Sequence, residues 1–331
     1  MYLYFYIKSK ADMNDLSKVS VLLLLFFCLM VSSASWAKDN DFFNFEHIKY
    51  AFIYLESPTT ANFEKLANSQ AMQHLKNHSD RTGYYSKEST AEDIAKDILA
   101  SDEINQELMN EVKQLLTYVE KSKDEQSYCL SKAKDYLPSD FNYDGNLYFT
   151  WGYDIGVSMD KNASLNLAHK TFREDAEEIW FYCIHELHHI GVQRYTRFPD
   201  LSNILTGTEL FALVKYLTFL EGSAVYASYE ARKIRNALDD PDYVALKDIE
   251  LMEKYEKEYF EIYEKVKLIG KRKLNDEDLN LLDDLSDGKR LWYRVGAKIA
   301  AEIDASLGRE GFKSLIQSGP DAFFNAYFNT E

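Results

Sequence analysis

Proline and glycine are scarce in this 331-residue sequence, which has 5 and 13 of them. Chains that stay disordered are usually rich in these residues and poor in apolar ones, whereas 46% of this sequence is hydrophobic. The composition therefore excludes a largely disordered chain. It predicts a globular protein with one large domain or two smaller ones.

Positive charge is also in short supply, because 38 Lys and Arg residues face 54 Asp and Glu residues. The formal net charge of -16 creates a negative field around the protein. Such a field repels the phosphate backbone of DNA and RNA and favours solubility. Nucleic acid is therefore not an expected partner.

Long hydrophobic runs are absent apart from residues 19–31. This run is too short to cross a bilayer as a helix and has the length of a signal-peptide core. Lys18 provides a positive flank, and small residues at Ser35 and Ala37 suit a cleavage site before Lys38. We expect residues 1–37 to be a signal peptide, with Met13 as an alternative start, and the mature protein to be periplasmic or secreted. The alternative is an uncleaved membrane anchor. No stable membrane span is expected after signal cleavage.

Only three cysteines occur, and two of them, Cys129 and Cys183, follow the leader. An oxidising compartment would permit a bridge between them. The alternative for Cys183 is a small apolar side chain on the buried face of a helix.

The sequence after the leader predicts a mainly α fold, because apolar residues recur at three- and four-residue spacing through most of it. Residues 145–168 differ, since aromatic and β-branched residues broken by glycines are typical of strands, and we expect a small antiparallel β-sheet there. The turn at Pro138 is the expected boundary between a helical N-terminal region (38–140) and a zincin-like catalytic region (141–331). Helices are expected near 42–56, 61–76, 90–121, 123–136, 171–191, 207–235, 243–269, 276–285, 287–307 and 310–328.

Residues 185–189 read His-Glu-Leu-His-His and match the pattern HExxH. On a helix this spacing puts His185 and His189 one turn apart on one face, where both imidazoles can bind one Zn²⁺, and sets Glu186 beside the open position of the metal. The alternative is that the two histidines decorate a solvated face. His188 points about 100° away from His189, which favours packing or support over a ligand role.

The expected helix around the motif runs over 171–191. Thr171 and Glu174 have the spacing of a capping box, and the apolar stripe that follows lies opposite the two histidines. Aromatic residues flank the histidines, which predicts that other elements cover that side as well.

A catalytic zinc site of this type needs a third protein ligand. A metzincin is excluded, because its extended motif requires Gly and His where this chain has Val192 and Tyr195. The third ligand is therefore a carboxylate. Glu209 and Glu221 are the candidates, and metal chemistry alone admits either. As an alternative role, Glu209 suits a helix N-terminus.

Three stretches together resemble a group of bacterial zinc-dependent peptidases related to the gluzincins. They are the HExxH motif, then Glu221-Gly222-Ser223-Ala224, and then a segment from Tyr293 to Ala301 with Gly296 inside it. The resemblance covers residues 171–331. It implies that Glu221 is the third zinc ligand, that Glu186 is the general base, and that the fold is a helical zincin-like metallopeptidase domain with a small sheet.

The resulting prediction is an exported zinc-dependent hydrolase of the gluzincin type, most simply a peptidase. A zinc-activated water attacks the peptide bond of a peptide or protein substrate, while Glu186 takes its proton. Tyr293 is the candidate donor to the oxyanion, and the alternative for this residue is a tyrosine of the core. The strand-like segment 147–158 could pair with an extended peptide. The alternatives are a zinc hydrolase of a non-peptide bond and a non-catalytic exported helical binding protein.

Overall fold

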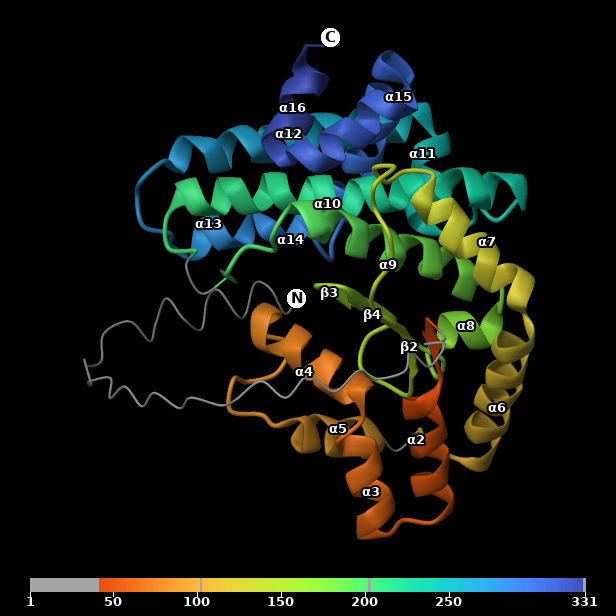
Figure 1. Cartoon of the computed structure of the whole chain (residues 1–331). Helices are drawn as coiled ribbons and strands as arrows, with labels where there is room; N and C mark the ends of the chain where they lie inside the picture. Colours follow the sequence, from red (N-terminus) through yellow and green to blue (C-terminus); the bar gives the residue numbers. More distant parts are fainter. Residues whose placement is uncertain (1–41, 102, 202–203, 330–331) are drawn as a thin grey trace, which may run out of the picture.

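The structure, a computed structural model, describes residues 42–101, 103–201 and 204–329 (Figure 1). The signal peptide expected over residues 1–37 lies outside these residues and stays a prediction. Within the described residues the chain is mainly α-helical, as the sequence predicts, with one four-stranded sheet.

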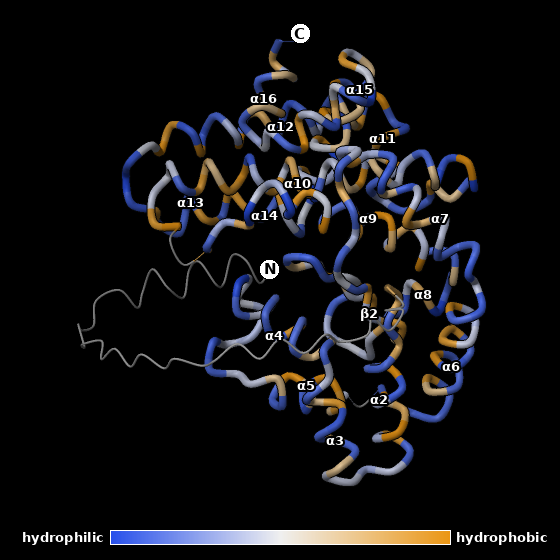
Figure 2. The backbone as a smooth tube through the Cα atoms, in the orientation of Figure 1, coloured by the Kyte–Doolittle hydropathy of each residue, from blue (hydrophilic) through white to orange (hydrophobic). Residues whose placement is uncertain are grey.

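Fifteen helices are found in the described residues. They are α2 (Glu46–Glu56), α3 (Thr60–Ala67), α4 (Gln70–Thr82), α5 (Ala91–Leu99), α6 (Gln106–Lys121), α7 (Lys123–Lys134), α8 (Lys170–Glu174), α9 (Glu178–Tyr195), α10 (Gly207–Ile234), α11 (Pro241–Lys247), α12 (Ile249–Ile269), α13 (Asp276–Asn280), α14 (Leu282–Leu285), α15 (Leu291–Ser318) and α16 (Pro320–Phe328). Figure 2 shows hydrophilic and hydrophobic stretches alternating along outer helices such as α6, as expected for helices with one buried face.

Several expected helices are in fact two helices, because a polar side chain caps a new start inside the apolar pattern. Ser69 accepts a hydrogen bond from the Met72 amide and begins α4, and Asn105 accepts one from the Leu108 amide and begins α6. Periodicity continues across such breaks, so apolar spacing alone does not reveal them.

The predicted start of the motif helix is wrong. Residues 170–174 form the separate short helix α8, capped by His169 rather than by Thr171. The chain is extended at Asp175, whose carboxylate accepts a hydrogen bond from the Glu177 amide, and α9 begins at Glu178. The motif therefore lies in the middle of α9.

Three of the four strands lie where strands are expected, whereas residues 43–44 form a strand at the start of the helix expected over 42–56. Most of the pairing is not antiparallel. The sheet contains β1 (Phe43–Asn44), β2 (Leu147–Thr150), β3 (Gly156–Met159) and β4 (Asn162–Asn166) in the order β1-β2-β4-β3. Only β3 and β4 pair antiparallel, whereas β2 pairs parallel with both β1 and β4. The reason is that the chain passes from β2 to the edge strand β3 and returns along β4 in the middle of the sheet.

Helices cover both faces of the sheet, and further helices form layers on one side of it. Figure 1 places α9 above the sheet and α2 and α4 below it, with α10 above α9 and α12, α15 and α16 farther up. One cluster of buried apolar side chains runs through these layers from Phe43 to Tyr327. α10 is long and apolar enough to cross a membrane. However, 72% of its most apolar stretch is buried inside the protein, which is typical of a core helix.

The long helices α10 and α15 approach each other at two glycines. A Cβ atom on Gly222 would lie 2.3 Å from the backbone of Gly296, and one on Gly296 would lie 2.5 Å from the carbonyl oxygen of Thr218. Gly222 therefore allows α10 to pack closely on α15. The neighbours of Gly222 are thus residues of α15 and not of the motif helix α9.

Cys129 of α7 and Cys183 of α9 form a disulfide with a Cα–Cα distance of 6.0 Å. The sequence offered two roles for Cys183, a disulfide and a buried apolar side chain. Both hold, because the residue is bridged and fully buried. The bond ties α7 to the motif helix two residues before His185.

Two buried histidines below the sheet make stability dependent on pH. His47 accepts a hydrogen bond from the Trp151 amide, and His74 packs against Tyr148. Burial lowers the pKa of His47 to about 3 and that of His74 to about 4. The unfolded chain, with ordinary histidine pKa values near 6.5, therefore binds more protons than the folded protein as the pH falls below about 6.5.

We expect these two histidines to make the free energy of unfolding fall with pH by up to about 3 kcal/mol per unit between roughly pH 6 and pH 4. Urea unfolding of the wild type and of a His47→Asn/His74→Asn variant over this range measures the effect, since Asn retains a polar atom near Nδ1. Proton binding at all other groups affects the wild type and the variant equally, so the difference between their free energies of unfolding reports the two histidines. Parallel curves for the two proteins would contradict the expectation.

Candidate metal site

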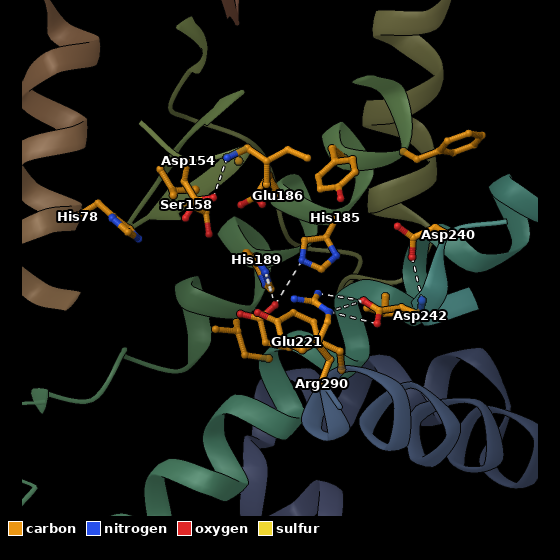
Figure 3. A pocket seen from close by; sticks show the side chains of 18 of the residues that line it. His78, Asp154, Ser158, His185, Glu186, His189, Glu221, Asp240, Asp242 and Arg290 are labelled. Carbon is orange, nitrogen blue, oxygen red and sulfur yellow. Dashed lines mark hydrogen bonds and ion pairs between the residues drawn. The ribbon is translucent and has the colours of Figure 1, made fainter. Parts of the chain in front are cut away.

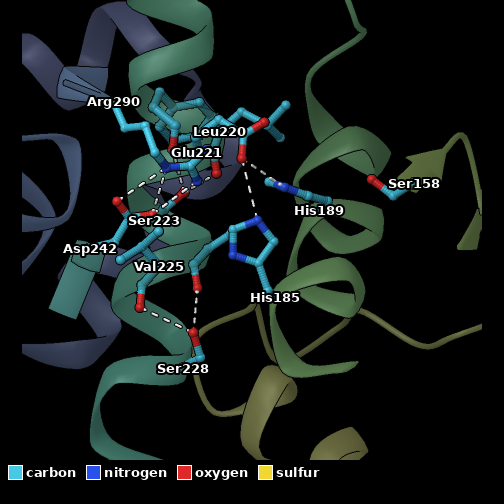
Figure 4. Close-up of polar contacts among 12 residues, drawn as sticks. Ser158, His185, His189, Leu220, Glu221, Ser223, Val225, Ser228, Asp242 and Arg290 are labelled. Carbon is cyan, nitrogen blue, oxygen red and sulfur yellow. Dashed lines mark hydrogen bonds and ion pairs between the residues drawn. The ribbon is translucent and has the colours of Figure 1, made fainter. Parts of the chain in front are cut away.

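The motif helix and the core helix α10 bring three ligand atoms together. The Nε2 atoms of His185 and His189 lie 3.3 and 3.1 Å from Oε2 of Glu221 (Figure 4). The three ligand atoms lie within 4.8 Å of one another, and the side chains are only 15%, 6% and 16% exposed. The alternative of a solvated face is not observed, because other elements cover this side of α9, as the flanking aromatic residues predict.

The spacing of these atoms fits a tetrahedral zinc ion. Bonds of about 2.1 Å in a tetrahedron separate neighbouring ligand atoms by roughly 3.4 Å. The two distances to Glu221 are close to this value. Two imidazole nitrogens and one carboxylate oxygen are also the donor set of a catalytic zinc site with one open position. The residues present therefore fit zinc.

The three side chains shift one another's pKa values. Burial and the neighbouring His189 lower the pKa of His185 to about 4. Burial also acts to lower the pKa of His189, but the carboxylates of Glu221 and Glu186 raise it above the usual value. Burial opposes the charge of Glu221, yet His189 and hydrogen bonds from both histidines hold its pKa far below the usual range. A carboxylate and a neutral His185 are the forms that ligate a metal.

Glu186 lies beside this cluster and under the edge strand. A Cβ atom on Gly156 of β3 would lie 2.8 Å from Oε1 of Glu186, so glycine is required for this approach. Burial raises the pKa of Glu186 to about 8, with further contributions from Glu221 and Asp154. A nearby cation would favour its carboxylate form. Its Oε2 is buried and has no hydrogen-bond partner among the described residues.

Ser158 and Gln193 support Glu186, and neither is among the site residues predicted from the sequence. The side-chain amide of Gln193 lies 3.2 Å from Oγ of Ser158, and a hydrogen bond from Ser158 lowers the pKa of Glu186. Ser158 and Glu186 lie close to each other in Figure 3. Gln193 lies two turns after Glu186 on α9, whereas Ser158 comes from β3. Spacing along the helix could have indicated Gln193, but only the tertiary structure brings Ser158 to it.

The other candidates lie elsewhere. Glu209 accepts hydrogen bonds from the amides of Leu205 (2.8 Å) and Thr206 (2.7 Å) in a capping box at the start of α10. It lies 12 residues before Glu221 on the same helix, which corresponds to roughly 18 Å. His188 is fully buried and does not line the cavity around the motif, as expected for packing.

Tyr293 lines the same cavity, which has a volume of about 550 Å³. Burial and the charge of Glu221 raise its pKa, so the phenol stays protonated and can donate a hydrogen bond. The guanidinium of Arg290 lies 3.7 Å from the centre of the Tyr293 ring. The structure thus brings the proposed ligands, base and oxyanion donor to one cavity.

A sequence profile of the family described as "putative zinc dependent peptidase (DUF5700)" matches residues 63–330. The chain belongs to this family. The match begins within α3 and covers most of the chain, including all the residues of the site. It agrees with the family resemblance seen in the sequence. Searches of curated proteins and of solved structures found no match.

Proposed function

We propose that this member of the zinc dependent peptidase family is an exported hydrolase of the gluzincin type that cleaves peptide bonds. The observation that carries the proposal is the meeting of His185, His189 and Glu221 at zinc-ligand spacing, with Glu186 buried beside them. A structural zinc site has no need of a carboxylate next to its ligands, whereas hydrolysis needs a base.

His185, His189 and Glu221 would hold the metal. A zinc ion there supplies Lewis-acid polarisation of the scissile carbonyl and activation of a water molecule. Glu186 takes the proton of the attacking water and passes it to the leaving amine. Tyr293 donates its hydroxyl hydrogen bond to the developing oxyanion. Ser158, held by Gln193, orients the carboxylate of Glu186.

The sheet supports a peptide as the substrate. β3 is an edge strand and lines the cavity, whereas β2 lies inside the sheet, so only the second part of segment 147–158 could pair with another chain. The amide of Asn166 in β4 donates a hydrogen bond to the carbonyl oxygen of Ile155, just before β3. In an antiparallel pair every second residue of a strand forms such backbone hydrogen bonds with its partner strand. The backbone groups of Gly156 and Ser158 therefore point away from β4. The carbonyl oxygen of Ser158 already accepts a hydrogen bond from the Gln193 side chain at 3.5 Å, so an extended peptide could bind at the backbone groups of Gly156.

The disulfide supports the exported location, since such bonds persist mainly in oxidising compartments. A non-peptide substrate is the second candidate, because the same ligand set allows it. Digestion of peptide libraries beside ester and amide panels separates the two.

Metal removal tests the proposal. We expect the purified mature protein to contain about one zinc per chain by elemental analysis, as a three-ligand site requires. A chelator should remove both the zinc and the hydrolysis of a peptide library, and added zinc should restore both. Absence of zinc after reconstitution would leave a helical binding protein as the better explanation.

A further inference from the structure

Two arginines line the cavity of the metal site, and they differ in what their guanidinium groups contact. Arg232 is only 2% exposed and binds both carboxylate oxygens of Glu178 at 2.7 and 2.6 Å. Its guanidinium also lies between the rings of Phe181 and Tyr243. Arg232 is therefore enclosed by protein and serves the packing of the wall.

Arg290 keeps donors for a ligand. Its Nε and Nη2 atoms lie 3.0 and 2.9 Å from Oδ2 of Asp242, and its side chain is 38% exposed. Nη1 has no hydrogen-bond partner in the described part of the chain. A guanidinium has five N–H donors in a fixed plane, so both donors of Nη1 and one of Nη2 remain, and they can bind a carboxylate with two hydrogen bonds.

The charge around Arg290 favours an anion. Asp242 also pairs with the buried Arg294, whose Nε lies 2.9 Å from Oδ1, so the three side chains carry a net charge of about +1. The cavity wall is otherwise rich in carboxylates, which come from Asp154, Asp240, Asp287, Glu186 and Glu221. An anionic group of a substrate is therefore attracted to Arg290 and repelled from the rest of the wall.

The backbone fixes where this guanidinium lies. Arg290 is the N-cap residue just before α15 and has a φ of 52°, a left-handed conformation that costs a non-glycine residue free energy. Contacts with Asp242 and Tyr293 hold the side chain. Arg290 lines the same cavity as His185 and Glu221 and lies beside Glu221 in two views, so a group bound to it lies near the proposed metal ligands (Figures 3 and 4).

We propose that Arg290 binds the free C-terminal carboxylate of a peptide substrate, so that the enzyme is a carboxypeptidase. Because Arg290 lies so close to the ligand cluster, the carboxylate belongs to the residue that follows the scissile bond. Water adds across that bond, the C–N bond breaks, its nitrogen takes the proton, and one amino acid is released. This inference rests on the proposed peptidase function.

Two libraries of N-acetylated pentapeptides test it, one ending in a free carboxylate and the other in a carboxamide. We expect the zinc-loaded wild type to release the last residue from the free acids at least tenfold faster than from the amides. Arg290→Gln should remove most of this preference. Arg290→Gly should do the same, and its backbone accepts the positive φ. Arg294→Lys, which changes the other partner of Asp242 but lies outside the cavity, should keep it.

Equal rates on both libraries in the wild type would overturn the proposal, as would an equal loss on both in Arg290→Gln. Binding of the same libraries to the zinc-loaded Glu186→Gln variant provides a readout without turnover. If Glu186→Gln binds the free-acid peptides in a manner that depends on Arg290, but the wild type cleaves no peptide, the carboxylate-binding site stands and the peptidase function is rejected. Absence of both binding preference and cleavage would reject both.

Discussion

Replacing Glu186 with Gln lowers the rate of peptide hydrolysis by about a hundredfold to ten thousandfold, the range expected for loss of a general base, and leaves one zinc bound. The amide has the shape of the carboxylate, so it fits beneath Gly156 of the edge strand. It cannot accept a proton from water. The proposed metal ligands His185, His189 and Glu221 are unchanged.

Steady-state kinetics and elemental analysis of the same preparations measure both quantities. Glu209→Gln is the matched control, because it makes the same chemical change at a helix cap that is roughly 18 Å along α10 from Glu221. The control should retain the wild-type rate. An unchanged rate in Glu186→Gln would remove this residue from the mechanism.

Replacing Glu221 with Ala weakens zinc binding by more than about a hundredfold. This loss exceeds the effect of changing residues that only hydrogen-bond to the ligands, for which a hundredfold is the upper range. Two histidines remain, and they provide fewer ligands than any catalytic zinc site uses. Glu209→Ala removes the cap of α10 at a cost of about 1 kcal/mol in stability but keeps the zinc.

Competition with a chromogenic chelator gives the zinc affinity of each variant, and thermal unfolding gives its stability. Zinc loss in Glu209→Ala together with retention in Glu221→Ala would reverse the assignment of the third ligand. Retention in both variants would mean that another group completes the site.

The elements of the fold were largely predictable, and their ends were not. Apolar spacing predicted most helices, because burial of one face dictates that spacing. It did not predict the break at Asp175 or the new start at Ser69, since single hydrogen bonds from side chains decide these positions. The parallel pairing of β2 and β4 was also missed, because strand order is not written in the alternation of residues within one strand.

The candidate site divides in the same way. His185, Glu186 and His189 follow from spacing on one helix, because 3.6 residues per turn place them together wherever the helix lies. The choice between Glu209 and Glu221 depended on a resemblance. Only the packing of α10 against α9 brings Glu221 to the histidines, while Glu209 remains at the helix cap.

The sequence by itself determined that this protein is mainly helical and strongly acidic, and that it carries an HExxH motif on one helix. Each of these rests on local periodicity or on composition. Only the tertiary structure decided that Ser158 reaches Glu186, that Cys129 meets Cys183 and that Arg290 lies at the site. These contacts join residues distant in the chain, and they form only when the helices and the sheet pack together to bury their apolar faces.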